Sequence, residues 1–129
     1  MGEKILGEKI LIVDDDPLLC NLLRMALGRE GFDTAEAYSG EDALSYLKAN
    51  TVDLILLDVM MADLNGFDVL RQLKADNATR NIPVIFLTAR VDAISQKTGM
   101  DIGAIEYLTK PITPDVLIER IRSVLTAHA

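Results

Sequence analysis

The most constraining feature of the sequence is its alternation of short apolar runs with longer amphipathic segments. The clearest runs are Ile10–Val13, Leu54–Leu57 and Val84–Leu87. Their continuous apolar character is typical of parallel strands that are covered on both faces. Weaker runs at Asp33–Tyr38 and Ile105–Thr109 predict strands nearer the edges of the same sheet. Five strands in alternation with five helical segments predict a doubly wound α/β domain.

The segments between and after these runs carry apolar residues at helical spacing. Such stripes, which predict amphipathic helices, lie within residues 19–27, 43–47, 69–73 and 117–125. The stretch 91–102 has the poorest stripe, and we interpret it as a helix with a weakly committed face. Asp16 is expected to cap the first helix, whereas Asp63 and Asn65 are expected to serve the turn into the third.

The length of the chain, 129 residues, allows one domain with a sizeable core but not two. We expect residues 1–8 to be an N-terminal extension and residues 9–129 to be the domain. The motif GEKIL occurs twice, at Gly2–Leu6 and Gly7–Leu11, and only the second copy leads into an acidic cluster. No apolar run is long enough to span a bilayer, and no signal peptide is evident.

Composition argues against several functional classes. The net charge is −7 and no cluster of Lys and Arg stands out, so we expect no direct binding of nucleic acid. The single histidine, His128, lies one residue from the C-terminus, which disfavours a Ser–His–Asp or Cys–His site and a zinc site. The single cysteine, Cys20, cannot form an internal disulfide and favours a reducing, cytoplasmic location. Carboxylates are the plentiful reactive groups.

Polar residues follow the strongest predicted strands at the point where each one ends. Asp14–Asp16 follow the first strand, Asp58 the third, Thr88 the fourth and Lys110 the fifth. The carboxyl ends of parallel strands meet at one edge of an open α/β sheet, where such sheets place their ligands. The order of residues therefore predicts an acidic pocket that also contains one hydroxyl and one ammonium group.

Crowded carboxylates indicate which chemistry this pocket can support. Two carboxylates about 5 Å apart repel by roughly 3 kcal/mol at an effective dielectric near 20, so three of them either raise each other's pKa or need a cation. A hard ion with oxygen ligands suits the cluster, and Mg²⁺ accepts a few carboxylates together with water and phosphate. A carboxylate beside bound Mg²⁺ can attack a phosphoryl donor, and Lys110 and Thr88 are donors able to hold the phosphoryl oxygens.

Four stretches of the sequence together resemble the receiver domains of two-component response regulators, of the chemotaxis-regulator type. They are ILIVDDDP (Ile10–Pro17), LILLDVMM (Leu54–Met61), PVIFLTA (Pro83–Ala89) and GAIEYLTKP (Gly103–Pro111). The resemblance runs from about residue 9 to residue 125, and it is specific because all four motifs occur in order. It implies a flavodoxin-like (βα)5 three-layer sandwich with a parallel sheet of order 2-1-3-4-5.

The resemblance also implies a metal site and an acceptor. Asp58 would be the phosphoacceptor and also a Mg²⁺ ligand. Asp15 would bind Mg²⁺ directly, and Asp14 would do so partly through water. The backbone carbonyl of Met60 would complete the protein's share of the coordination.

Further residues would contact the phosphoryl group or respond to it. By the resemblance, the Thr88 hydroxyl, the Ala89 backbone N–H and the Lys110 ammonium would bind phosphoryl oxygens. The Lys110–Pro111 peptide bond would be cis. Thr88 and Tyr107 would form the switch, although Tyr107 is equally well interpreted as a packing residue of an edge strand.

The sequence departs from the family pattern at several positions. Ala62 stands where proline is usual, which predicts a more mobile loop after Asp58, and Ile112 replaces a common phenylalanine. Met60 and Arg90 occupy the positions that tune the lifetime of the phosphoryl group, and we expect no fast self-dephosphorylation. Ile105 breaks the acidic pattern that is usual in the DNA-binding subgroup.

The implied partners are a histidine kinase or histidine phosphotransfer protein and a downstream effector. A homodimer through the face of the fourth and fifth helices is a further expectation. Two alternatives remain. One is a Mg²⁺-dependent aspartyl-phosphate phosphohydrolase, although such enzymes usually carry a second Asp where Met60 stands. The other is a pseudo-receiver that acts only as an interaction module, although every site residue is present.

Overall fold

The sheet is parallel and contains five strands in the order β2-β1-β3-β4-β5. The computed structural model describes residues 7–128. Its strands are β1 (Lys9–Val13), β2 (Asp33–Ala37), β3 (Leu54–Leu57), β4 (Val84–Thr88) and β5 (Glu106–Thr109). β3 and β4 are buried along their whole length, and β1 is buried from its second residue on, whereas β2 and β5 are largely half-buried. The predicted strands, and the assignment of the two weaker ones to the edges, are confirmed.

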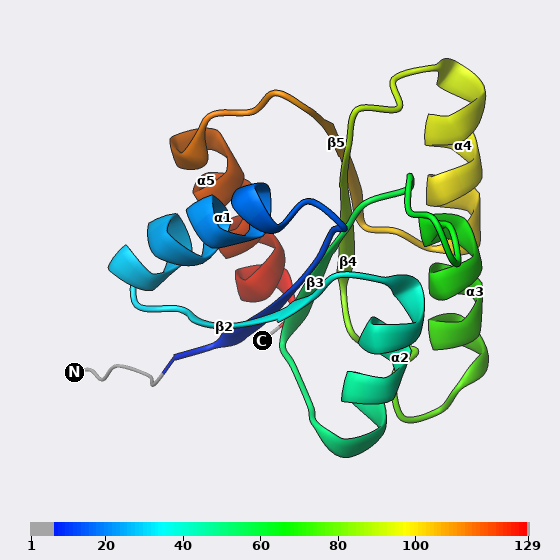
Figure 1. The fold of residues 1–129 in the computed structure, drawn as a ribbon, viewed down its shortest axis with the longest axis horizontal. Coiled ribbons are helices and arrows are strands. Elements are labelled where there is room, and N and C mark those ends of the chain that lie inside the picture. Colours follow the sequence, from blue (N-terminus) through cyan, green and yellow to red (C-terminus); the bar gives the residue numbers. More distant parts are fainter. Residues whose placement is uncertain (1–6, 129) are drawn as a thin grey trace.

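Helices cover both faces of the sheet (Figure 1). They are α1 (Pro17–Arg29), α2 (Gly40–Ala49), α3 (Gly66–Ala75), α4 (Ala93–Ile102) and α5 (Pro114–Ala127). α1 and α5 lie on one side, and α2, α3 and α4 lie on the other. This arrangement is the doubly wound fold that the alternation of apolar runs predicts.

Alternate residues of each strand supply two separate cores. On β1, Ile10 and Ile12 pack in the core beneath α1 and α5, whereas Leu11 and Val13 pack in the core beneath α2 and α3. Successive strand side chains point to opposite faces, so a strand that must fill both cores is apolar at every position. None of the helices in the described part of the chain is long and apolar enough to cross a membrane.

The helix starts are set by local capping, with one exception to the sequence prediction. Asp16 accepts from the backbone N–H groups of Leu18 and Leu19, and Asn65 accepts from that of Asp68, as expected for caps of α1 and α3. The expectation for Asp63 is wrong, because its carboxylate accepts from the first two backbone N–H groups of α2 instead. The first copy of GEKIL lies outside the described residues.

Candidate functional site

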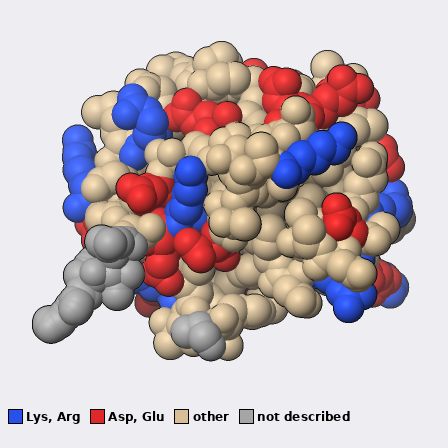
Figure 2. Space-filling view, turned by 90° about the horizontal axis from the view of Figure 1, so that it is seen from below, with Lys and Arg blue, Asp and Glu red and all other residues tan. Residues whose placement is uncertain are grey.

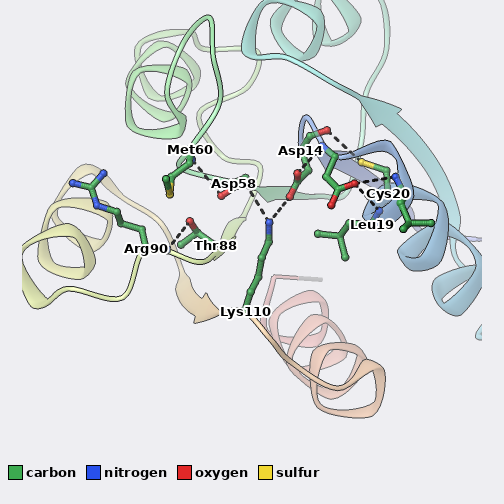
Figure 3. Close-up of polar contacts among 10 residues, drawn as sticks. Asp14, Leu19, Cys20, Asp58, Met60, Thr88, Arg90 and Lys110 are labelled. Atoms are coloured by element: carbon green, nitrogen blue, oxygen red, sulfur yellow. Dashed lines mark hydrogen bonds and ion pairs between the residues drawn. The ribbon is translucent and has the colours of Figure 1, made fainter.

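The strand register brings the carboxyl ends of four strands to one edge of the sheet. Val13 pairs with Leu57, and Thr88 pairs with Thr109. The next residues are tied across the strands by hydrogen bonds from the Asp58 N–H to the Val13 carbonyl (3.0 Å) and from the Lys110 N–H to the Thr88 carbonyl (2.8 Å). The side chains that follow these strands therefore lie together (Figure 3).

Three carboxylates converge at this edge. Asp14, Asp15 and Asp58 each offer one oxygen, and these oxygens lie within 4.8 Å of one another. Asp14 and Asp58 are only 4% and 6% exposed, whereas Asp15 is exposed. Asp15 is thus accessible to solvent, whereas Asp14 and Asp58 are enclosed by the domain.

The Lys110 ammonium lies between the two buried carboxylates. Its Nζ is 2.7 Å from Asp14 Oδ2 and 3.3 Å from Asp58 Oδ2, as the dashed lines in Figure 3 show. Burial by itself lowers the pKa of Lys110, but the hydrogen bond to Asp14 and the charges of both carboxylates outweigh it and raise that pKa above its ordinary value. Lys110 is therefore a fixed cation.

Asp14 is the most electrostatically stressed of the carboxylates. Burial raises its pKa, and the Asp58 charge adds to this, while the hydrogen bonds from Lys110 and the Asp16 backbone N–H lower it; the net effect is a raised pKa. Burial without enough compensating charge is the physical cause. Three carboxylates and one ammonium leave a formal charge of −2, and hard oxygen ligands with this charge fit a divalent cation such as Mg²⁺.

The loop between β3 and α3 presses against Asp58. The Met60 N–H donates to Asp58 Oδ1 (3.3 Å), and the Gly66 N–H closes the loop on the Val59 carbonyl (2.8 Å). A Cβ at Gly66 would lie 2.3 Å from the Asp58 carbonyl oxygen, so this close approach requires glycine. The Asn65-Gly66 signal in the sequence thus marks a contact with the candidate acceptor as well as a turn.

Thr88 is fully buried at the end of β4. Its Oγ1 accepts from the Arg90 N–H (3.2 Å), and the intervening Ala89 is exposed. Thr88 does not cap α4, because Asp92 occupies the cap position and accepts from the Ser95 N–H. The Thr88 hydroxyl is therefore held in the wall of the site by its own loop.

Tyr107 joins β5 to that same loop. Its hydroxyl donates to the Arg90 carbonyl (2.6 Å), and its ring lies 5.6 Å from the Phe86 ring. Burial raises the pKa of the phenol. Tyr107 therefore both packs against Phe86 and contacts the loop that follows Thr88. The Lys110–Pro111 peptide bond, beside the end of the same strand, is cis.

Sequence reasoning missed one part of the site's surroundings. The Arg90 Nε pairs with Asp92 Oδ1 (3.1 Å), and Figure 3 shows the guanidinium directed away from Asp58. Asp92 also accepts from the Ser95 hydroxyl (2.9 Å). The available signal was the spacing of Asp92 and Ser95, which is that of an N-cap and the third residue of a helix.

The fold and the site together define a class of protein, and comparison with known proteins agrees with it. The family model for the response regulator receiver domain matches residues 10–122. The chain belongs to this family, whose members serve signal transduction by two-component systems.

Individual relatives carry the same description. The DNA-binding response regulator MtrA of Mycolicibacterium smegmatis is 42% identical over 116 residues, which cover 90% of this chain and 50% of MtrA. The transcriptional regulatory protein CpxR of Klebsiella pneumoniae is 46% identical over 117 residues, which cover 91% of this chain and 49% of CpxR. This chain spans about half the length of these curated relatives.

Solved structures share the fold. The receiver domain of the Francisella response regulator 1452 superimposes with a TM-score of 0.89 at 32% identity, covering 95% of this chain and all of that one. A CheY-like receiver domain protein from Methanospirillum hungatei superimposes with a TM-score of 0.90 at 24% identity, covering 95% of this chain and 96% of that one. The five-stranded order and the receiver architecture are thus established for this chain.

Proposed function

We propose that Asp58 accepts a phosphoryl group from a histidine kinase or a histidine phosphotransfer protein, and that this controls an output partner. The observation that supports it best is the convergence of Asp14, Asp15 and Asp58 around the Lys110 ammonium at one sheet edge. A lone aspartate after a strand is usually a loop residue, whereas this group combines a nucleophile with the cation it needs.

Mg²⁺ fits the charge and the oxygen ligands of the cluster. In the proposed site it would be held by Asp14, Asp15, Asp58 and the Met60 carbonyl. When bound, Mg²⁺ supplies positive charge that allows an anionic phosphoryl donor to approach the carboxylates.

The chain's own side chains then have distinct tasks. A carboxylate oxygen of Asp58 forms the new bond to phosphorus as the bond to the donor breaks, and the donor leaves with its electron pair. Lys110, now bound to both carboxylates, holds a phosphoryl oxygen as charge moves. The Thr88 hydroxyl and the Ala89 backbone N–H donate to the remaining oxygens. Thr88 is the last residue of β4, and Ala89 and Lys110 directly follow β4 and β5, so all three donors are attached to the sheet.

We also propose how the phosphoryl group reaches the surface. It adds about −1.5 to −2 charges beside Thr88. Drawing the Thr88 hydroxyl toward this charge would break its bond to the Arg90 N–H, and the Arg90 carbonyl is the acceptor for Tyr107. Movement of Tyr107 would reshape the surface of β5 and α4. A shift from 1:99 to 99:1 needs about 5.5 kcal/mol, which a few charge-assisted hydrogen bonds supply.

We further propose the bounds of the domain, its location and its dimer face. Residues 1–8 are an extension and 9–129 the receiver domain, the location is cytoplasmic, and a homodimer would use the α4–α5 face. MtrA is described as DNA-binding; because these 129 residues carry a net charge of −7, any contact with DNA would lie elsewhere in a longer protein.

The test is the intact mass of the chain after incubation with acetyl phosphate and Mg²⁺. One phosphoryl adduct is expected, absent with a chelator and absent in Asp58→Asn. Retention of the full adduct by Asp58→Asn would exclude Asp58 as acceptor. Sustained hydrolysis of a small phosphoester would favour the phosphohydrolase alternative. No adduct, together with no binding of beryllofluoride, would favour the pseudo-receiver.

A further inference from the structure

The loop between β3 and α3 (residues 58–65) carries an exposed aspartate that binds a distant helix. Asp63 Oδ1 accepts from the Gly40 N–H (3.0 Å), and Asp63 Oδ2 accepts from the Glu41 N–H (2.9 Å). These are the first two N–H groups of α2, which have no partner within the helix itself. Both carboxylate oxygens of Asp63 are thus engaged in one bidentate contact across 22 and 23 residues of sequence.

The fit around this contact is close. A Cβ added at Gly40 would lie 2.8 Å from the Leu64 Cβ and 2.8 Å from Val69 Cγ2, so the start of α2 lies directly against the loop. α2 already has a cap of its own, because Ser39 Oγ accepts from the Asp42 N–H (3.0 Å). The contact from Asp63 is therefore additional to local capping. The N–H of Glu41 is the main cause of the lowered pKa of Asp63, so the carboxylate stays charged.

The two segments that Asp63 joins both lead to the candidate site. On the loop side, Met60 precedes Asp63 by three residues, and its N–H donates to Asp58 Oδ1. On the α2 side, β2 ends at Ala37, whose carbonyl accepts from the Asp14 N–H (3.1 Å). Asp63 therefore links the loop that carries Met60 to the segment that follows β2, in addition to the β1–β3 pairing that already joins Asp14 and Asp58.

The rest of the loop is held by apolar packing, because Val59 and Met61 are buried in the core beneath α2 and α3. Ala62 is exposed and has no proline ring to limit its backbone. Gly66 fixes only the end of the loop, against Asp58 and Val59. The bidentate contact from Asp63 is the polar restraint on the exposed part of this loop, in addition to the apolar packing on either side of Met60.

We propose that Asp63 is a positioning residue for phosphoryl transfer, which fixes the loop so that the Met60 N–H and carbonyl keep their places beside Asp58 and the Mg²⁺ ligands. The inference rests on the proposed function, because it needs a reaction that depends on Mg²⁺. Asp63 contacts neither the metal nor the phosphoryl group; it acts through Met60.

The test measures, in the full chain, the Mg²⁺ concentration that half-saturates direct binding in calorimetry and the one that half-saturates the rate of phosphorylation by acetyl phosphate. Asp63→Ala is expected to raise both concentrations roughly tenfold, the lower end of what residues behind metal ligands contribute. Asp63→Asn retains one acceptor oxygen and is expected to give a smaller rise. The rate at saturating Mg²⁺ is expected to change less than the half-saturating concentration, since the chemical groups are intact.

Ser39→Ala is the matched control. It removes a cap from the same helix terminus, and each cap is worth about 1 kcal/mol, but it leaves the link to the loop in place. Ser39→Ala should lower the melting temperature without changing the Mg²⁺ requirement. Adding Ala62→Pro to Asp63→Ala should restore part of the lost Mg²⁺ affinity, because proline restricts the same loop.

The outcomes separate the two proposals. Equal Mg²⁺ requirements for Asp63→Ala and Ser39→Ala, with a normal wild-type reaction, would overturn the role of Asp63 alone. A wild-type chain that takes no phosphoryl group would overturn the proposed function and the inference with it. Should Asp63→Ala fail to fold, the same comparison between Asp63→Asn and Ser39→Ala decides the question.

Discussion

The sheet has one edge formed by the carboxyl ends of its strands and an opposite edge formed by their amino ends. Polar groups are arranged differently at these two edges. At the carboxyl edge, Asp14 and Asp58 are buried and share one ammonium. At the opposite edge, seen in Figure 2, acidic and basic side chains are interspersed on the surface. There Lys74 Nζ donates to the Arg80 carbonyl (3.0 Å) and Asp53 accepts from the Lys9 N–H (2.7 Å). Each of these two charged side chains binds a single backbone group in an exposed position.

The larger hollow does not lie at the candidate site. The hollow at the opposite edge has a volume of about 690 Å³ and includes Asp53, Lys74 and Arg80 in its lining, whereas the hollow beside Asp15, Met60 and Arg90 has about 580 Å³. What sets the candidate site apart is the burial of two like charges, Asp14 and Asp58, beside one cation. Buried charge has to be compensated, and this requirement is the physical basis of a binding site.

The sharpest test of this difference replaces one lysine at each edge by methionine, in separate variants. Lys110→Met is expected to lower the rate of phosphorylation by acetyl phosphate about 100-fold, as for loss of one preorganised donor to developing charge. Lys74→Met, which removes a lysine from the opposite edge, should leave the rate unchanged. Equal losses in the two variants would show that the effect reflects general stability. The rates are to be compared at saturating Mg²⁺.

The next largest effect is expected at a glycine of the carboxyl edge. A Cβ at Gly66 would lie 2.3 Å from the Asp58 carbonyl oxygen, whereas one at Gly28, in α1, meets nothing within 4 Å. Gly66→Ala should lower the free energy of unfolding by at least about 1–3 kcal/mol, because backbone has to move. Gly28→Ala should instead be neutral or stabilising by up to about 1 kcal/mol. Urea unfolding measures both, and a neutral Gly66→Ala would refute the close contact.

The sequence made the carboxyl edge predictable because its signals are local. Asp14, Asp58, Thr88 and Lys110 each directly follow a run that predicts a strand, and parallel strands bring such ends together. Asp16 could be assigned as a cap for the same reason, since a cap and its partners are only two or three residues apart.

Contacts between distant segments were not predictable. Asp63 looks like an ordinary turn residue, because its partners Gly40 and Glu41 are more than 20 residues away. The position of Lys110 between Asp14 and Asp58 also depends on side-chain packing rather than on spacing. The hollow at the opposite edge is lined by residues from several separate loops, so no single motif marks it.

A smaller effect, confined to alkaline pH, is expected beneath the carboxyl edge. Cys20 is fully buried, its Sγ lies 3.4 Å from the Asp14 carbonyl, and burial raises the pKa of its thiol to about 12. Between about pH 9 and about pH 12 the thiol ionises in the unfolded chain but stays protonated in the folded chain. The unfolded chain therefore gains stability relative to the folded chain as the pH rises through this range. Stability should fall more steeply over this range in wild type than in Cys20→Ala.

The same thiol offers an independent measurement. Because thiolate is the reactive form, iodoacetamide at pH 8.5 should modify native Cys20 much more slowly than Cys20 in the chain unfolded by urea. Equal rates of alkylation would contradict the burial of Cys20 and with it the packing of α1 beneath Asp14.

The smallest expected effect separates two roles of Asp92, at the margin of the carboxyl edge. Asp92 caps α4 through the Ser95 N–H and pairs with Arg90, and the cap is the main cause of its lowered pKa. Asp92→Ala removes the cap, the bond from the Ser95 hydroxyl and the ion pair, and should lower the free energy of unfolding by about 1 kcal/mol. Asp92→Asn keeps one side-chain oxygen to accept from Ser95 and loses the charge that forms the exposed ion pair, so its cost should stay below that of Asp92→Ala, at about 0.5 kcal/mol. Urea unfolding at two salt concentrations tests this division, because salt screens only the ion pair. Equal losses of unfolding free energy in both variants would mean that the pair with Arg90, and not the cap, holds the start of α4.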